Sequence, residues 1–191
     1  PEAVLVPIGG GGLAAGVALA LKSQGVRIIG AQVEGVDAMA RALKGDAAAI
    51  TPRATLADGT RVAQAGTLTR EILAKHLDDL IIVREAELRE TLARLMLEEH
   101  IVAEGAGALA LAAGRRVASK RKVAVVSGGN IDAAVFAQLL LDTRPRTPRP
   151  PRRRGPDPFF VDGNPGRSTL AAVSLPGIAA PFSKTPEGSL P

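Results

Sequence analysis

Apolar residues fall along the chain into short β-branched runs and longer runs with helical spacing. The short runs predict strands at 4–8, 26–33, 80–83 and 123–126. The longer runs predict helices at 13–22, 37–43, 67–76, 85–99, 106–119 and 133–141. Because strands and helices alternate, the pattern predicts an α/β fold, an open parallel sheet with helices on both faces.

Three segments that are rich in glycine or polar residues directly follow predicted strands. Gly9–Gly12 comes after the first strand, Glu34 after the second, and Ser127–Asn130 after the last. The carboxyl ends of parallel strands lie at one edge of a sheet, and ligands of such sheets collect at that edge. We therefore expect the three segments to contribute to one site.

The segment VLVPIGGGGLAAG (4–16) joins a predicted strand to a helix through four consecutive glycines. Glycines carry no Cβ atom that would obstruct a ligand, and they adopt backbone angles closed to other residues. Backbone N–H groups at a helix N-terminus bind anions, and the helix dipole favours negative charge there. The segment therefore predicts a phosphate-binding loop.

Two kinds of phosphorylated ligand fit this loop. Gly10-x-Gly12-x-x-Ala15 satisfies the relaxed dinucleotide fingerprint, with Glu34 at the end of the next strand to hold a ribose hydroxyl. That fingerprint does not account for the second glycine turn in VVSGGNID (125–132). There Ser127 can hydrogen-bond a ring nitrogen without imposing a charge, so the second turn favours a planar cofactor that carries a phosphate.

The apolar pattern stops near residue 141, which predicts a folded domain at 1–141 and a low-complexity, disordered tail at 142–191. The tail holds 11 of the 14 prolines and has 8 Lys+Arg against 4 Asp+Glu, whereas the domain has 16 against 15. Three interpretations of the tail remain open: disorder without function, which is favoured, a basic segment for nucleic acid, or out-of-frame translation.

Composition narrows the class of protein further. The absence of cysteine excludes disulfides and thiolate metal sites and suits a cytoplasmic protein. No apolar run approaches the roughly 20 residues of a membrane span, and the balanced charge of the domain gives no basic face for nucleic acid. We therefore expect a small-molecule ligand, with neither a membrane nor a nucleic acid as partner.

His76 and His100, both expected on helices, lack partners at catalytic spacing.

Five motifs then identify a family. They are VPIGGGGLAAGVA (6–18), IGAQVEG (29–35), TLADGTRVAQAG (55–66), VAEGAGALALAA (102–113) and VVSGGNID (125–132). In this order they resemble the second half of the catalytic domain of fold-type II pyridoxal-phosphate enzymes. The nearest group is that of threonine/serine dehydratases and serine racemases, because related synthases carry different glycine loops.

The resemblance implies roles for particular residues. Ser127 would hydrogen-bond the pyridine nitrogen of pyridoxal 5'-phosphate, and Gly66 would let the backbone approach the cofactor, although a bare glycine is more often an ordinary turn residue. Glu104 would lie near the ring edge, or would equally be a helix N-terminal acid favoured by the dipole. Backbone N–H groups for the cofactor phosphate would come from Gly9, Gly10, Gly11, Gly12 and Leu13.

The resemblance also implies an activity: a threonine (or serine) dehydratase, in a homo-oligomeric parent enzyme, that releases a 2-oxo acid and ammonia. No lysine of the chain lies in the family's Schiff-base motif, so we expect no catalytic residue here, a fragment of a longer enzyme, and no activity by itself. Some relatives bind a cation at the position of Glu34, but Ala40 stands where the second acid would be, so no metal is expected. The alternatives are a dinucleotide-binding domain of an oxidoreductase and a remnant without function.

Overall fold

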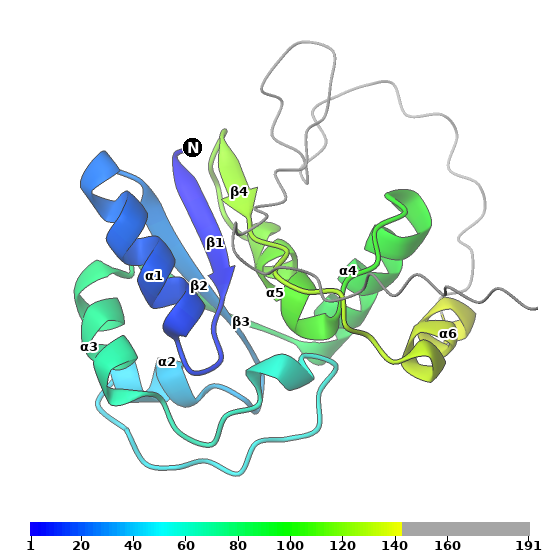
Figure 1. Ribbon diagram of the computed structural model, residues 1–191, viewed down its shortest axis with the longest axis horizontal. Helices are drawn as coiled ribbons and strands as arrows, with labels where there is room; N and C mark the ends of the chain where they lie inside the picture. Colours follow the sequence, from blue (N-terminus) through cyan, green and yellow to red (C-terminus); the bar gives the residue numbers. More distant parts are fainter. Residues whose placement is uncertain (143–191) are drawn as a thin grey trace, which may run out of the picture.

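The computed structural model describes residues 1–142, and its strands form one parallel sheet in the order β3-β2-β1-β4 (Figure 1). The strands are β1 (Ala3–Pro7), β2 (Arg27–Val33), β3 (Asp79–Val83) and β4 (Lys122–Ala124). β1 pairs with β2 on one side and with β4 on the other, and all of its residues are buried. The order places the carboxyl ends of β1 and β4 side by side, as the prediction of a shared site requires.

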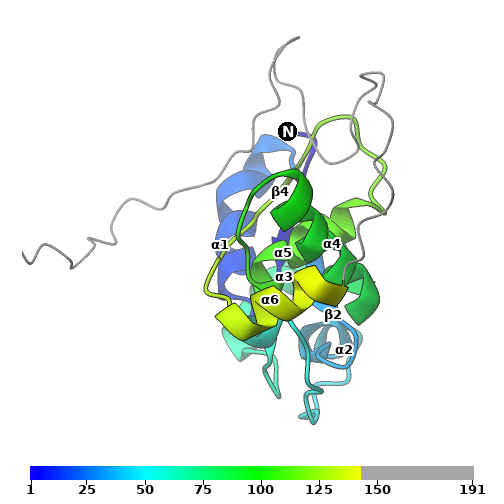
Figure 2. The ribbon, with the colours of Figure 1, turned by 90° about the vertical axis from the view of Figure 1, so that its right-hand side faces the viewer.

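Helices cover both faces of this sheet (Figures 1 and 2). They are α1 (Gly12–Leu21), α2 (Ala38–Leu43), α3 (Thr67–His76), α4 (Glu85–Glu98), α5 (Gly105–Gly114) and α6 (Ala133–Asp142), with short 3-10 turns η1 (Lys22–Gln24) and η2 (Asp58–Thr60). On one face α1 and α3 pack with Val6, Ile8 and Ile28. On the other face α4 and α5 pack with Leu5 and Ile29.

The predicted α/β class, parallel sheet and two covered faces are therefore confirmed. The amphipathic pattern of α4 is confirmed as well, because its apolar stripe is buried at Leu88, Leu92, Leu95 and Met96. The part of the tail from residue 143 lies outside the described residues. Within the described part, no helix is long and apolar enough to span a membrane.

Several predicted boundaries were wrong for local reasons. The helix expected at 106–119 ends at Gly114, where Lys122 Nζ donates to the carbonyl oxygens of Gly114 (2.8 Å) and Val117 (2.7 Å). These bonds give a partner to two carbonyls at and just beyond the early end of the helix. Burial lowers the pKa of Lys122. His100 follows α4 with a positive φ of 59° instead of lying on a helix.

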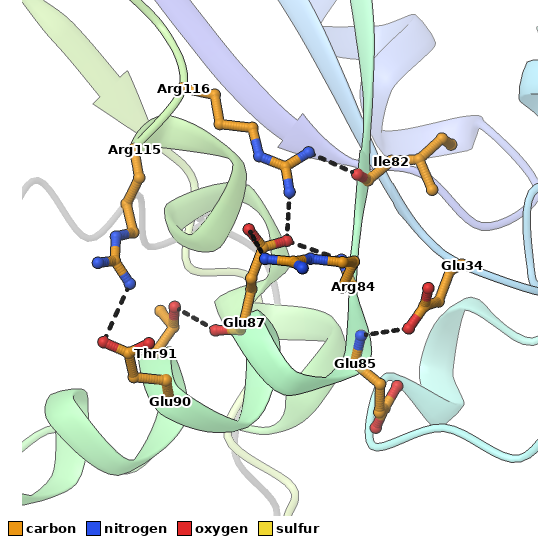
Figure 3. Close-up of polar contacts among 9 residues, drawn as sticks. All are labelled: Glu34, Ile82, Arg84, Glu85, Glu87, Glu90, Thr91, Arg115 and Arg116. Atoms are coloured by element: carbon orange, nitrogen blue, oxygen red, sulfur yellow. Dashed lines mark hydrogen bonds and ion pairs between the residues drawn. The ribbon is translucent and has the colours of Figure 1, made fainter.

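An ionic cluster joins α4 to the end of α5 (Figure 3). The Glu87 carboxylate accepts from the Arg116 guanidinium and, at 3.2 Å, from Arg84, while Arg116 Nη1 donates to the Ile82 carbonyl at 2.8 Å. The hydrogen bond from Arg116 is the largest cause that lowers the pKa of Glu87 from 4.5 to about 2. The cluster therefore fixes the position of the C-terminal end of α5 relative to α4 and β3.

Candidate functional site

The glycine loop lies where β1 leaves the sheet. Ile8 is fully buried and its N–H donates to Ala31 O at 2.8 Å, so the chain stays in the sheet up to the first glycine. Gly11 then adopts a φ of 94° and acts as the N-cap of α1. The first N–H groups of a helix have no partner inside it, so those of Gly12 and Leu13 are available to a ligand.

The glycines of the loop meet two different surroundings. A Cβ on Gly11 would lie 2.8 Å from Met39 Cε and 2.9 Å from the Thr69 side chain, and one on Gly9 would lie 3.0 Å from Thr60 Cα. A Cβ on Gly10 or Gly12 would meet nothing within 4 Å. The loop is therefore held closely by the protein on one side and open on the other.

The buried side-chain amide of Gln32 supports the glycine loop at the residue that precedes it. Gln32 is fully buried at the end of β2, and its Nε2 donates to Ile8 O (3.2 Å) and Val36 O (3.3 Å). Its Oε1 accepts from the N–H of Ala40 in α2 at 2.8 Å. Gln32 thus joins the residue before the first glycine to the helix that carries Met39, the residue packed against Gly11.

The start of α3 forms the closed wall. Gly66, an extended residue with φ −66°, is the N-cap of α3. Thr69 Oγ1 donates to Gly10 O at 2.6 Å and lies 3.1 Å from Gly66 O. A Cβ on Gly66 would stand 2.7 Å from that hydroxyl oxygen.

Glu104 links the glycine loop to the second turn. It is the N-cap of α5, but its side chain makes no capping bond and instead reaches Gly128, where an added Cβ would overlap its carboxylate. Its backbone N–H donates to Gly128 O at 3.0 Å. An added Cβ on Gly59 would lie 3.7 Å from Glu104 Oε1, and the next residue, Thr60, touches Gly9. Contacts therefore run without a break from one turn to the other.

The second turn continues from β4 at the sheet edge. Val125 N–H still donates to Leu5 O at 3.0 Å, and the chain then leaves the sheet. Ser127 is exposed just beyond this point. The turn lies directly on α5, because a Cβ on Gly107 would overlap the Gly128 carbonyl and one on Gly129 would lie 2.9 Å from Val102 O.

Glu34 has a different role from the other residues singled out in the sequence. Its Oε1 accepts from the N–H of Glu85 at 3.0 Å, so the carboxylate caps the start of α4 (Figure 3). Glu85 in turn accepts from Thr55 Oγ1 (2.6 Å) and Leu56 N–H (2.7 Å). Residues 1–142 contain no group of three or more acidic or histidine side chains that could hold a metal ion.

Comparison with known proteins shows which family this geometry belongs to. Residues 1–128 match the family described as "Pyridoxal-phosphate dependent enzyme". The chain belongs to this family. Its fold is that of the fold-type II enzymes, and the resemblance in the five motifs is thereby confirmed. Membership also speaks against the dinucleotide alternative, in which Glu34 would have held a ribose.

The proteins that are similar to this chain include a threonine dehydratase, a threonine deaminase and a serine racemase. "L-threonine dehydratase catabolic TdcB" of Escherichia coli is 41% identical over 145 residues, which cover 71% of this chain and 44% of that protein. Maize serine racemase superimposes with a TM-score of 0.64 at 31% identity, over 74% of this chain and 47% of that one. The processed form of threonine deaminase isoform 2 from Solanum lycopersicum gives a TM-score of 0.66 at 28% identity, over 72% and 43%. The chain spans less than half the length of each.

The arrangement fits pyridoxal phosphate as the family's cofactor. The open side at Gly10 and Gly12 is a space that side chains would fill, and it adjoins the unpaired N–H groups of α1. The structure brings every residue named for the cofactor to one edge of the sheet.

The sequence missed Thr69, Thr60 and Met39, which surround the glycines from distant parts of the chain. The sequence places a threonine three residues after Gly66, but the pattern of apolar residues predicts only that Thr69 lies on a helix and not that it contacts the loop.

Proposed function

We propose that the protein is part of a pyridoxal-phosphate-dependent dehydratase of threonine or serine, and that this chain provides the cofactor's phosphate and ring contacts. The observation that carries the proposal is the meeting of two glycine turns at the ends of neighbouring strands, β1 and β4. A turn with open backbone suits a phosphate, and a turn with an exposed hydroxyl suits a ring nitrogen. Residues 1–141 would form the corresponding part of the catalytic domain.

The phosphate would lie on the open side of the glycine loop. Backbone N–H groups of Gly9–Gly12 and Leu13 would donate to its oxygens, and the positive end of the α1 dipole would favour the negative charge. Gly66 lies behind the loop, where an added Cβ would stand 3.3 Å from the Gly10 carbonyl oxygen. We therefore propose that Gly66 contributes by having no side chain, which leaves room for Thr69 to contact the loop.

The ring would lie between the two turns. Ser127 would hydrogen-bond the pyridine nitrogen, and a neutral hydroxyl at that position leaves the nitrogen without a proton. Glu104, held against Gly128, would border the ring and keep the second turn in place. The bound cofactor supplies withdrawal of electrons from the α-carbon of an amino acid, which promotes loss of the α-proton and of the β-hydroxyl.

We propose that the covalent anchor for the cofactor is not one of the lysines described here. Lys22 is paired with Asp78 at 2.5 Å, and Asp78 accepts from Ile28 N–H at the start of β2. Lys122 begins β4 and binds the end of α5. Both lie at the amino ends of the strands, opposite the glycine turns. The lysine that holds the aldehyde and moves the α-proton would come from other residues of the parent enzyme.

Threonine is the first candidate substrate because the Escherichia coli relative, at 41% identity, is a threonine dehydratase by name. Serine is the second, because the maize relative is a serine racemase. The products would be a 2-oxo acid and ammonia. We also propose that the parent enzyme acts in the cytoplasm as a homo-oligomer.

Two measurements test the proposal. Pyridoxal 5'-phosphate added to the isotope-labelled 191-residue chain should shift the amide signals of residues 9–13 and 127–129, because these would surround the cofactor. Shifts confined to other parts of the chain, or none, contradict it. The same chain given threonine and pyridoxal phosphate should form no 2-oxobutyrate, whereas formation of 2-oxobutyrate above a cofactor-only control contradicts the proposed absence of catalytic residues.

A further inference from the structure

Thr69 contacts the glycine loop at a carbonyl group rather than at a ligand-facing atom. Its Oγ1 lies 2.6 Å from Gly10 O and 3.1 Å from Gly66 O. A hydroxyl donates one hydrogen, and the shorter distance assigns it to Gly10. Gly66 O already accepts the helical N–H of Arg70 at 2.9 Å, so it does not need this donor.

The carbonyl of Gly10 and the N–H of Gly11 belong to one peptide group. Residues 1–142 contain no cis peptide bond, and in a planar trans peptide the C=O and N–H point in opposite directions. A donor that holds the Gly10 carbonyl toward α3 therefore holds the Gly11 N–H away from α3. Gly11 has a φ of 94°, and at such glycines the flanking peptides have more than one accessible orientation.

We infer that Thr69 is a positioning residue that fixes the orientation of the Gly10–Gly11 peptide, so that the Gly11 N–H faces the phosphate and the Gly10 carbonyl does not. The opposite orientation would aim a carbonyl oxygen at an anion. The orientation of the peptide does not depend on the proposed function. The statement that the Gly11 N–H faces a phosphate rests on the proposed function.

Gly66 supports the same inference from an independent contact. A Cβ on Gly66 would lie 2.7 Å from Thr69 Oγ1 and 3.3 Å from Gly10 O. Gly66 has φ −66° and ψ 137°, a conformation that alanine adopts without strain. An alanine at this position therefore introduces no backbone strain and crowds the hydroxyl and the carbonyl that it binds.

The experiment compares Thr69→Ser, which keeps the hydroxyl, with Thr69→Val, which keeps the shape and removes it. Carbonyl ¹³C and amide shifts of Gly10 and Gly11 report the peptide in the isotope-labelled 191-residue chain. Calorimetry reports the Kd of pyridoxine 5'-phosphate, which lacks the aldehyde and so does not react with surface lysines. Urea unfolding confirms that each variant is folded.

Thr69→Ser should match the wild type in both readouts. Thr69→Val should move the Gly10 carbonyl shift and raise the Kd about fivefold, the factor that corresponds to one net hydrogen bond. Gly66→Ala should do the same, and the double variant should not exceed either single one, because both remove one interaction.

An unchanged Gly10 carbonyl shift in Thr69→Val overturns the inference, as does equal affinity in the serine and valine variants. A wild-type chain that does not bind pyridoxine 5'-phosphate contradicts the proposed function and the phosphate role of Thr69. In that case the carbonyl shift alone still decides whether Thr69 fixes the peptide.

Discussion

The two turns of the site follow neighbouring strands, yet the protein holds them very differently. The turn after β1 is enclosed by three elements, through Met39 of α2, Thr69 of α3 and Thr60 of η2. The turn after β4 rests on α5 and the residues just before it, and β4 itself is only half-buried, at the edge of the described sheet. The proposed phosphate end, the turn after β1, is therefore held in place by several elements of this chain, whereas the proposed ring end, the turn after β4, depends on the position of one helix.

The largest effect is expected from Gly11→Ala, which attacks the enclosed turn. Alanine at φ 94° is strained, and its Cβ would lie 2.8 Å from Met39 Cε, so we expect a loss of about 3 kcal/mol in unfolding free energy. The control is Gly25→Ala, at φ 74° with nothing within 4 Å, which should cost only about 1 kcal/mol. Urea denaturation measures both, and equal losses would show that the enclosure of Gly11 is not tight.

The second effect concerns the amide beneath that turn. Gln32→Leu leaves the buried carbonyls of Ile8 and Val36 and the N–H of Ala40 without their partner, which should cost about 2 kcal/mol. Gln24→Leu removes one exposed bond to Ala20 O and should change stability by less than about 0.5 kcal/mol. Similar values for the two variants, in the same denaturation experiment, would contradict the importance of this support.

The third prediction uses the pH dependence of the unfolding free energy to test whether the Glu87 cluster holds α5 in position. The guanidinium of Arg116 lowers the pKa of Glu87 from 4.5 to about 2, so the carboxylate stabilises the folded state above pH 4.5. This stability is lost as the pH falls from 4.5 toward 2, because protonation removes the charge that Arg116 binds. The side chain is partly solvent-screened, so we expect a loss of about 1 kcal/mol.

Glu87→Gln should remove that part of the pH dependence, and Glu90→Gln should not, because Glu90 forms only an exposed pair with Arg115 at 3.2 Å and 50% side-chain exposure. Stability measured by denaturation between pH 6 and pH 3 decides the matter. Identical pH profiles for the two variants would mean that the Glu87 cluster does not hold α5.

The smallest effect is expected from Ser127→Ala. Ser127 is exposed, so its removal should leave unfolding free energy within about 0.5 kcal/mol of the wild type. The Kd for pyridoxine 5'-phosphate should rise less than about twofold in the isolated chain, because a solvent-exposed hydrogen bond contributes little. A tenfold loss by calorimetry would contradict the contrast between the turns, since it would make the ring end as well organised as the phosphate end.

The sequence was most informative where the structure depends on neighbouring residues. Strand, four glycines and helix follow one another within 4–16, so the loop and its open N–H groups could be predicted from local chemistry. The wall of the loop could not, because Thr60 lies within the segment 46–66 and Thr69 follows it, and no periodic pattern of apolar residues fixes the path of this segment. The early end of α5 likewise depends on Lys122, which returns to Gly114 from the next strand.

The proposed function requires above all that this chain by itself recognises the cofactor through its phosphate. Calorimetric titration of the 191-residue chain with pyridoxine 5'-phosphate and, separately, with pyridoxine tests this directly, because the two ligands differ only by the phosphate. We predict saturable binding of the first and binding of the second at least tenfold weaker, about 1.4 kcal/mol or more. Equal affinity for the two ligands, or no binding of either, would contradict it.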